Sequence, residues 1–192
     1  MYDVLKQICE SRKSARAFSS KKIDDAFIKK IIDAAYTSPF ASRRKSWKII
    51  TITDKDQISR IAEITSNKIK NLENSIKSEF TEFFVKYSKN FIFFEQAPVL
   101  LIPVFRIFPV MSYMMKDNNN SLDIFERDNY TKSIGCVSML ILLAAESLGL
   151  KACMMTGLLI AETEISDALN INAGMNIGAI IPVGYEKEQD NG

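Results

Sequence analysis

The sequence predicts an α+β fold with a central, mostly antiparallel sheet of four or five strands flanked by helices. Two runs, 47–53 and 97–105, are rich in β-branched and aliphatic residues and have the length of strands. Apolar residues at helical spacing mark 24–37 as an amphipathic helix. A further run, 130–148, is apolar on nearly every side, which is typical of a helix buried on all faces.

Two helices are expected before the first strand. Residues 2–11 form the first, and the second occupies 24–37, where Asp24 is suited to cap the start and Pro39 ends the helix. The apolar stripes consist of Val4, Leu5, Ile8 and Cys9 in the first helix and Phe27, Ile28, Ile31, Ile32 and Ala35 in the second.

A helical region follows the strand at 47–53. Asp54 is expected to cap a short helix, and a longer helix with a lysine- and glutamate-rich polar face follows it. The apolar positions are Ile58, Ile61 and Ala62 in the short helix and Ile69, Leu72, Ile76, Phe80, Phe83, Phe84 and Tyr87 in the long one.

The second half of the chain alternates strands and helices around the apolar run 130–148. In a domain of this size, a helix that is apolar all round is expected to be shared with a partner subunit. The expected elements are a strand at 97–105, an irregular loop at 116–121, the buried helix ending at Gly149, short strands near 151–155 and 177–185, and a capped helix at 161–169 between them.

Composition limits the classes of protein. The 192 residues, 47% of them hydrophobic, show no repeat or linker and suit one domain spanning 1–192. The 25 basic and 23 acidic residues leave a net charge of only +2, which argues against a dedicated nucleic-acid binder. Histidine is absent, so Ser-His and Cys-His nucleophile systems and imidazole metal sites are excluded.

The cysteines and the apolar runs indicate the compartment. Cys9, Cys136 and Cys153 are scattered, and without a C-x-x-C pair no metal site or dithiol motif is expected. An odd number of cysteines and no secretory apolar run near the start predict a reducing, cytoplasmic location. The longest apolar stretch, 98–115, holds three prolines and an arginine, so a membrane span is not expected.

The stretch E-S-R-K-S-A-R at 10–16 is the first candidate binding motif. The seven glycines form neither G-x-G-x-x-G nor a P-loop, so cationic side chains would have to bind any phosphate. An extended chain puts Arg12, Ser14 and Arg16 on one side, and a helix also brings the two arginines together. A phosphate monoester would reverse their mutual repulsion. The alternative is a set of solvated surface cations.

The stretch S-P-F-A-S-R-R-K-S-W at 38–47 is the second candidate. Pro39 fixes the backbone, and the small residues Ala41 and Ser42 allow a ligand to approach closely. The cluster Arg43–Lys45 beside Trp47 suggests a nucleic-acid patch as an alternative. A core role for Trp47, which opens a β-branched run, is favoured instead.

These motifs together resemble the nitroreductase family of flavin mononucleotide (FMN) oxidoreductases over nearly the full length. The matching segments, in order, are S-R-K-S-A-R-A-F after the first helix, the helix D-D-A-F-I-K-K-I-I-D-A-A-Y-T-S-P, Trp47 leading W-K-I-I-T-I-T, the run A-A-E-S-L-G-L-K-A-C-M-M-T-G and the closing I-I-P-V-G-Y. Each is weak alone, but their order and spacing are specific. The resemblance implies a nitroreductase-like fold whose helix 130–148 lies at a homodimer interface.

The resemblance also implies binding roles for two segments. Arg12 would bind the FMN phosphate with Lys13 and Ser14 beside it. Arg16 would lie near the pyrimidine edge of the flavin, where reduction places negative charge. The stretch Pro39, Phe40, Ala41, Ser42 and Arg43 would cover the flavin held mainly by the other subunit.

Further contacts are implied later in the chain. Thr156 and Gly157, after Met155, would place backbone N–H groups near flavin N5 and O4, where a bare glycine backbone lets the ring lie close. Asn67 is a candidate amide contact, and Lys187 is the sole candidate for a C-terminal phosphate cation. The sequence departs from the family at Arg43, where an asparagine is usual, and this makes the mouth of the site more cationic.

The activity implied is NAD(P)H-dependent reduction of an electron-poor acceptor such as a nitroaromatic or a quinone, by a ping-pong mechanism. Flavin N5 would take hydride from NADH or NADPH, so no catalytic acid, base or nucleophile is expected in the chain. One alternative is a flavin-using relative that does not oxidise nicotinamide, such as a flavin-cleaving or dehalogenating enzyme. Another is a non-enzymatic nucleic-acid or regulatory partner that uses Arg43–Lys45.

Overall fold

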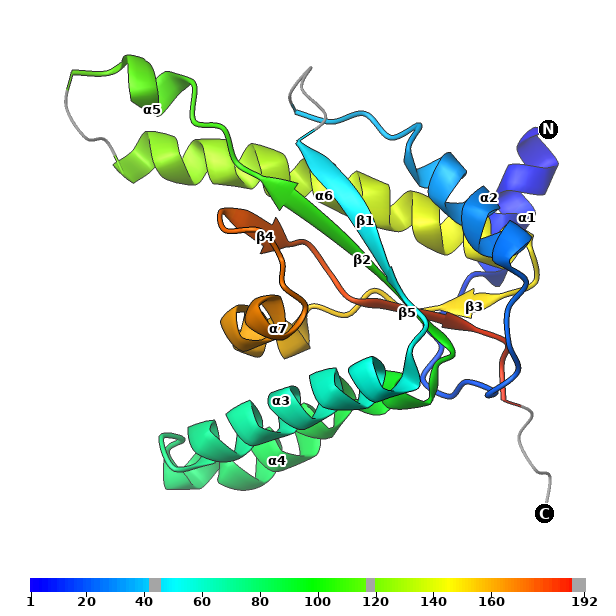
Figure 1. Cartoon of the computed structure of the whole chain (residues 1–192), viewed down its shortest axis with the longest axis horizontal. Helices are drawn as coiled ribbons and strands as arrows, with labels where there is room; N and C mark the ends of the chain where they lie inside the picture. Colours follow the sequence, from blue (N-terminus) through cyan, green and yellow to red (C-terminus); the bar gives the residue numbers. More distant parts are fainter. Residues whose placement is uncertain (42–45, 117–119, 188–192) are drawn as a thin grey trace.

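A five-stranded antiparallel sheet lies at the centre of the structure, a computed structural model that describes residues 1–41, 46–116 and 120–187 (Figure 1). The strand order is β1-β2-β5-β3, and β4 pairs with the far end of β2. This confirms the predicted α+β fold class. The strands are β1 (Trp47–Ile52), β2 (Val99–Arg106), β3 (Lys151–Ala152), β4 (Met175–Ile177) and β5 (Ile181–Gly184).

Strand β2 is the centre of the fold because it pairs with β1 on one edge and with β4 and β5 on the other. Its side chains alternate between two apolar clusters, since successive strand residues point to opposite faces. Leu100 and Ile102 join the cluster beneath α3 and α7, while Leu101 and Phe105 join the cluster beneath α2 and α6. The predicted buried strand is therefore confirmed.

Helices cover both faces of the sheet (Figure 1). One face carries α2 and α6, with α1 against the end of α6; the other carries α3, α4 and α7. The α-helices are α1 (Tyr2–Ser11), α2 (Asp25–Ala35), α3 (Lys55–Glu73), α4 (Thr81–Ser88), α5 (Met111–Met114), α6 (Asn120–Ser147) and α7 (Glu162–Ala168), and the short 3₁₀ helices are η1 (Ser78–Phe80), η2 (Lys89–Phe91), η3 (Phe93–Gln96) and η4 (Gly157–Ala161).

Both predicted N-caps are present. Oδ1 of Asp24 accepts the Ala26 N–H at 2.8 Å, and the carboxylate of Asp54 accepts the N–H groups of Asp56 and Gln57 at 2.8 and 3.0 Å. These bonds satisfy backbone donors that have no partner within the first helical turn. They fix where α2 and α3 begin.

The prediction of a short helix followed by a long one at 55–87 is wrong. One helix, α3, runs to Glu73, and the chain then turns back into the shorter α4, so the two lie side by side (Figure 1). The turn begins at Asn74 and Ser75, residues that favour turns over helix interiors. The apolar stripe assigned to one helix is thus shared between two.

Helix α6 begins ten residues earlier than the predicted start at 130. The irregular loop predicted at 116–121 is wrong for its last residues, because α6 starts at Asn120; residues 117–119 lie outside the described part of the chain. A single chain buries Val137 and Ile141 but leaves Met139 46% exposed, so it does not cover every side of α6. In the described ranges, no helix is both long and apolar enough to cross a membrane.

Two further predictions near the C-terminus are corrected. The strand expected at 177–185 is two strands, β4 and β5, because the chain shifts along β2 at Gly178, whose N–H donates to Pro103 O at 2.8 Å. A Cβ at Gly178 would crowd that carbonyl and the side chain of Ile134. The capped helix expected at 161–169 is α7, which follows η4 directly and has no side-chain cap.

Candidate functional site

The stretch after α1 is extended and lies against the edge of the sheet. Arg12 ends α1 with an extended backbone (φ −61°, ψ 117°), and Ser14 forms a parallel bridge with Ala152 of β3. Ala15 is buried, and its N–H donates to Ala152 O at 3.3 Å. Because side chains alternate along an extended chain, Ser14 and Arg16 face away from the core. The extended interpretation of the motif is therefore confirmed, and the helical one is wrong.

Among the residues that the structure describes, the three cations of this stretch have no acidic partner. Arg12 is half-buried and Lys13 and Arg16 are exposed. Across the described residues, none of the three side chains takes part in an ion pair or hydrogen bond. The neighbouring Lys151, by contrast, lies 2.9 Å from Glu146. The motif thus carries positive charge that the described chain does not neutralise.

A hollow of about 850 Å³, called here the cation hollow, opens beside this stretch. Lys187 reaches it because Phe18 pairs with Glu186 and the Lys187 N–H donates to Ala17 O at 3.4 Å. The C-terminal cation considered from the sequence therefore lines the same hollow as the N-terminal motif. Its polar and charged lining comprises Glu10, Ser11, Lys13, Ser14, Arg16, Lys151, Glu186 and Lys187.

Cys153, which the sequence analysis did not single out as a site residue, lies among the residues of the motif. It is 8% exposed and follows β3 directly. Burial raises the pKa of the Cys153 thiol, while a hydrogen bond with Ser14 and the charges of Arg16 and Arg12 act in the opposite direction. Ser14 therefore lies next to this thiol, and both arginines are near enough for their charges to act on it. The signal available in the sequence was its position in the matched run K-A-C-M-M-T-G.

The same run leads from the motif to Thr156 and Gly157. Met155 is buried and exchanges two 3.0 Å backbone hydrogen bonds with Ile180. A Cβ atom at Gly157 would overlap the ring of Phe91, so packing within the chain already requires a glycine there. Packing against Phe91 accounts for the glycine by itself, whether or not a ligand also lies close to its backbone.

The stretch 39–41 is held elsewhere, against β1 and α6. The Phe40 ring stacks on Trp47 at 5.7 Å and meets Tyr130 edge-on at 5.8 Å. The Ala41 N–H donates to Ser133 Oγ at 3.0 Å, and Pro39 is exposed. None of the three lines the cation hollow. Ser42, Arg43 and the cluster Arg43–Lys45 lie outside the described residues.

Asn67 also lies apart from the motif within one chain. It is exposed on α3, next to Lys68, whose Nζ lies 2.6 Å from Glu164 Oε1 of α7. It is not among the residues that line the cation hollow. A single chain therefore brings together the N-terminal motif, Cys153 and Lys187, and leaves Asn67 and Pro39–Ala41 at other places.

This arrangement fits a phosphate-bearing anion. Arginine and lysine supply charge-assisted hydrogen bonds to phosphate oxygens, and the Ser14 hydroxyl can donate another. The cations of the motif are not otherwise engaged in the described chain, so a phosphate dianion would gain attraction without breaking an ion pair. In the same residues, no group of three or more Cys, Asp or Glu is arranged to hold a metal ion.

The chain belongs to the Nitroreductase family, whose model matches residues 9–185. A curated relative from Archaeoglobus fulgidus, named as an NADH dehydrogenase/NAD(P)H nitroreductase, is 33% identical over 63 residues. That match covers 33% of this chain and 36% of the relative.

Solved structures share the fold. A BluB-like flavoprotein from Clostridium difficile 630 aligns with a TM-score of 0.86 and 23% identity over 98% of this chain and 92% of its own. A nitroreductase with bound FMN from Desulfitobacterium hafniense aligns with a TM-score of 0.73 and 18% identity, over 97% of this chain and 90% of its own. An iodotyrosine deiodinase bound to FMN and 3-iodo-L-tyrosine aligns with a TM-score of 0.71 and 19% identity, over 97% of this chain and 91% of its own.

Proposed function

We propose that this protein is an FMN-dependent oxidoreductase that takes hydride from NADH or NADPH and reduces an electron-poor acceptor, such as a nitroaromatic or a quinone, by a ping-pong mechanism. One observation carries the proposal: Arg12, Lys13 and Arg16 are unpaired in the described chain and lie beside Ser14 and Cys153 in a Nitroreductase-family fold. We further propose that the chain forms a single domain and that the protein is located in the cytoplasm, as the sequence predicts.

Each cation has a separate role in this proposal. We assign Arg12, Lys13 and Ser14 to the phosphate. Lys13, Ser14 and Lys187 line the cation hollow, whereas Arg12 lies next to it at the end of α1. Arg16 stabilises the negative charge of the reduced ring. When bound, FMN supplies the group that accepts and donates hydride. The chain has no histidine, so it contributes binding, orientation and electrostatics.

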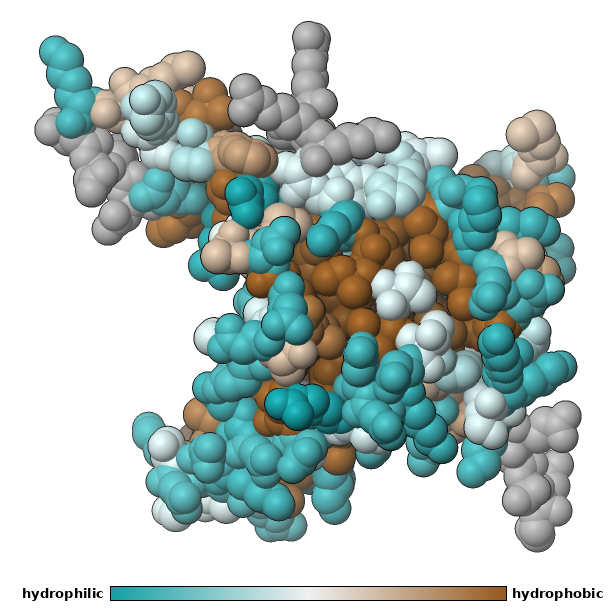
Figure 2. Space-filling model, viewed as in Figure 1, coloured by the Kyte–Doolittle hydropathy of each residue, from teal (hydrophilic) through white to brown (hydrophobic). Residues whose placement is uncertain are grey.

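We further propose a homodimer with FMN at the interface. Large apolar side chains stay exposed on α1, α4 and the α5–α6 region, among them Val4, Phe83 and Tyr113 at 60, 68 and 87%. Exposed apolar surface of this extent is typical of a protein interface. On the face seen in Figure 2, apolar residues gather over the centre while hydrophilic ones cover α3 and α4. A second chain could bring its own Pro39–Arg43 and Asn67 to the flavin.

An anaerobic absorbance experiment tests the activity, and sedimentation tests the assembly. The purified protein should be yellow, and NADH or NADPH should bleach the flavin bands, which an added quinone restores. Dithionite serves as the control for complete reduction. A protein that binds no FMN contradicts the cofactor assignment. Sedimentation equilibrium should give twice the mass of one chain, and a chain that stays monomeric with FMN bound contradicts the interface site.

The second candidate is a flavin enzyme that does not oxidise nicotinamide, such as a dehalogenating or flavin-cleaving one. The likeness to iodotyrosine deiodinase favours it, since that structure holds FMN and 3-iodo-L-tyrosine. In this case NADH and NADPH leave the bands unchanged, whereas the dithionite-reduced protein releases iodide from 3-iodo-L-tyrosine or consumes its flavin under oxygen. The nicotinamide and iodide outcomes are measured in one anaerobic cuvette series, and flavin consumption is measured after oxygen is admitted.

A further inference from the structure

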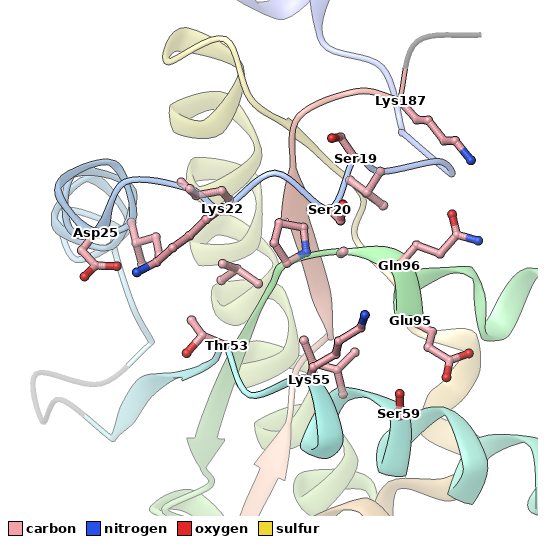
Figure 3. Close-up of a pocket in the computed structure, with 17 residues that line it drawn as sticks. Ser19, Ser20, Lys22, Asp25, Thr53, Lys55, Ser59, Glu95, Gln96 and Lys187 are labelled. Carbon is pink, nitrogen blue, oxygen red and sulfur yellow. The ribbon is translucent and has the colours of Figure 1, made fainter. Parts of the chain in front are cut away.

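A second hollow, of about 870 Å³, lies between residues 19–25, the first turn of α3 and the turn that leads into β2 (Figure 3). We call it the α3 hollow. Its volume is within the range of roughly 300–1,000 Å³ found for small-molecule sites. Lys187 is the one described residue that it shares with the cation hollow, so it is a separate place on the protein.

The floor of the α3 hollow is apolar and firmly packed. Phe18, Ile23, Ile58 and Val99 line it, and each is at most 3% exposed. The stretch above them is tied to the sheet, because the Ser19 N–H donates to the carbonyl oxygen of residue 185 at 2.9 Å. The floor therefore exists before any ligand arrives, which lowers the entropy cost of binding.

The rim of the α3 hollow is polar, and several of its described side chains make no hydrogen bond within the described part of the chain. The side chains of Ser20, Thr53, Ser59 and Gln96 have no hydrogen-bond partner anywhere in the described ranges. The ammonium of Lys55 points from α3 into the space between Thr53, Ser20 and Gln96 (Figure 3). It also has no acidic partner within 1–41, 46–116 or 120–187.

The remaining charges of this hollow select the ligand's charge. Lys22 and Asp25 line one edge of the hollow, and Lys187 points away from its centre (Figure 3). Together with Glu95, the lining holds three lysines and two acids, a net charge of +1. The N–H groups of Asp56 and Gln57 at the start of α3 are not available, since Asp54 caps them. Lys55 is the described lysine whose ammonium points into the hollow, so it can meet an anion there, and the two acids disfavour a dianion.

We propose that the α3 hollow binds a small amphiphilic monoanion, an aromatic or short-chain carboxylate. The carboxylate pairs with Lys55 and accepts hydrogen bonds from Ser20 or Gln96, while the apolar body lies on Ile23, Ile58 and Val99. The site does not depend on FMN or on the cation hollow.

Methyl NMR of the protein as purified, with its bound flavin, tests the site. The isoleucine methyls are labelled with ¹³C, and 4-fluorobenzoate is titrated against 4-fluorobenzamide, its neutral isostere. We expect saturable shifts of the Ile23 and Ile58 methyls with the carboxylate and much weaker binding of the amide. Lys55→Met should weaken carboxylate binding roughly threefold to tenfold, as for a charge pair that is partly exposed.

The matched control is Lys70→Met, which removes an exposed lysine from the last turn of the same helix. It should leave carboxylate binding unchanged. The proposal is overturned if neither methyl shifts, if Lys55→Met binds the carboxylate as well as the parent does, or if the amide binds equally well. Flavin absorbance is followed in parallel, and a response there without methyl shifts places the carboxylate at the flavin and also overturns the proposal.

Discussion

Two charged regions of the molecule are built in opposite ways. Glu126 of α6 is 7% exposed, and its carboxylate accepts the N–H groups of Val110 and Met111 and, at 2.7 Å, the hydroxyl of Ser112. The cations of 12–16 have no such partner in the described chain. A buried charge is stable only when it is paired or hydrogen-bonded. An exposed charge is solvated by water and needs no partner in the protein, so it remains available to a ligand. Glu126 therefore stabilises the fold by holding residues 110–112, and the cations are available to bind an anion.

The largest expected effect is on cofactor binding by Arg12→Ala. Loss of a charge-assisted bond to phosphate costs roughly 1.5–3 kcal/mol, or about ten- to a hundredfold in affinity. Equilibrium FMN titration measures it. Lys6→Ala, which removes a cation that lies 3.7 Å from Glu10, is the control and should bind FMN normally. Equal affinity in both variants would mean that the motif is solvated surface charge.

A smaller effect is expected for Arg16→Ala, on redox behaviour more than on affinity. Removing a positive charge from beside the reduced ring should lower the flavin reduction potential and slow hydride uptake. Anaerobic redox titration at saturating FMN measures the potential, with Arg12→Ala as the comparison. If the two variants have the same potential, the division of roles between the arginines is wrong.

Glu126 provides a pH test of the other region. Burial pushes the pKa of Glu126 up, but hydrogen bonds from Met111, Ser112 and Val110 outweigh this and hold it below its ordinary value of 4.5. A carboxyl with a lowered pKa stabilises the fold above that ordinary value and loses the contribution as pH falls through the lower folded value. Hydrogen exchange of residues 110–112, relative to Glu126→Gln at each pH, should therefore show protection at pH 6 that fades below about pH 4.5. Equal exchange in the two proteins at pH 6 would contradict the assigned role of Glu126.

The smallest effect on FMN affinity is expected at Lys151, which lines the cation hollow but is paired with Glu146. Lys151→Met should cost about 1–3 kcal/mol of unfolding free energy, because the Glu146 side chain is only 9% exposed and loses its partner. Its FMN affinity should fall far less than that of Arg12→Ala, because Glu146 already balances its charge. Urea unfolding and FMN titration check both values, and an affinity loss as large as that of Arg12→Ala would show that pairing does not decide which cations bind.

Local signals were sufficient for much of the fold. The runs 47–53 and 97–105 were recognised because β-branched composition is a property of the strand itself. Asp24 and Asp54 were recognised because a cap bonds within three residues of its own position. The extended form of 12–16 needed the structure, since both backbone conformations bring the arginines together.

Long-range partners decided what the sequence could not show. The role of Glu126 depends on N–H groups about 15 residues away, and nothing in the polar run 120–129 marks that glutamate. Gly157 depends on Phe91, and Cys153 on a segment from the start of the chain. The turn at Asn74 was hidden because apolar spacing continued on both sides of it. Asn67 and Pro39–Ala41 would need a second chain to reach the motif.

The pairing of the N-terminal stretch has a consequence for biosynthesis. Ser14 bridges to Ala152, Phe18 to Glu186, and the Lys187 N–H donates to Ala17 O, so the stretch 14–18 pairs with residues that are translated much later. During translation, the stretch 14–18 after α1 has no strand partner until residues 152–187 have been made. The cation hollow is complete only after residue 187 has left the ribosome, so a phosphate-bearing ligand can be bound there only after that point.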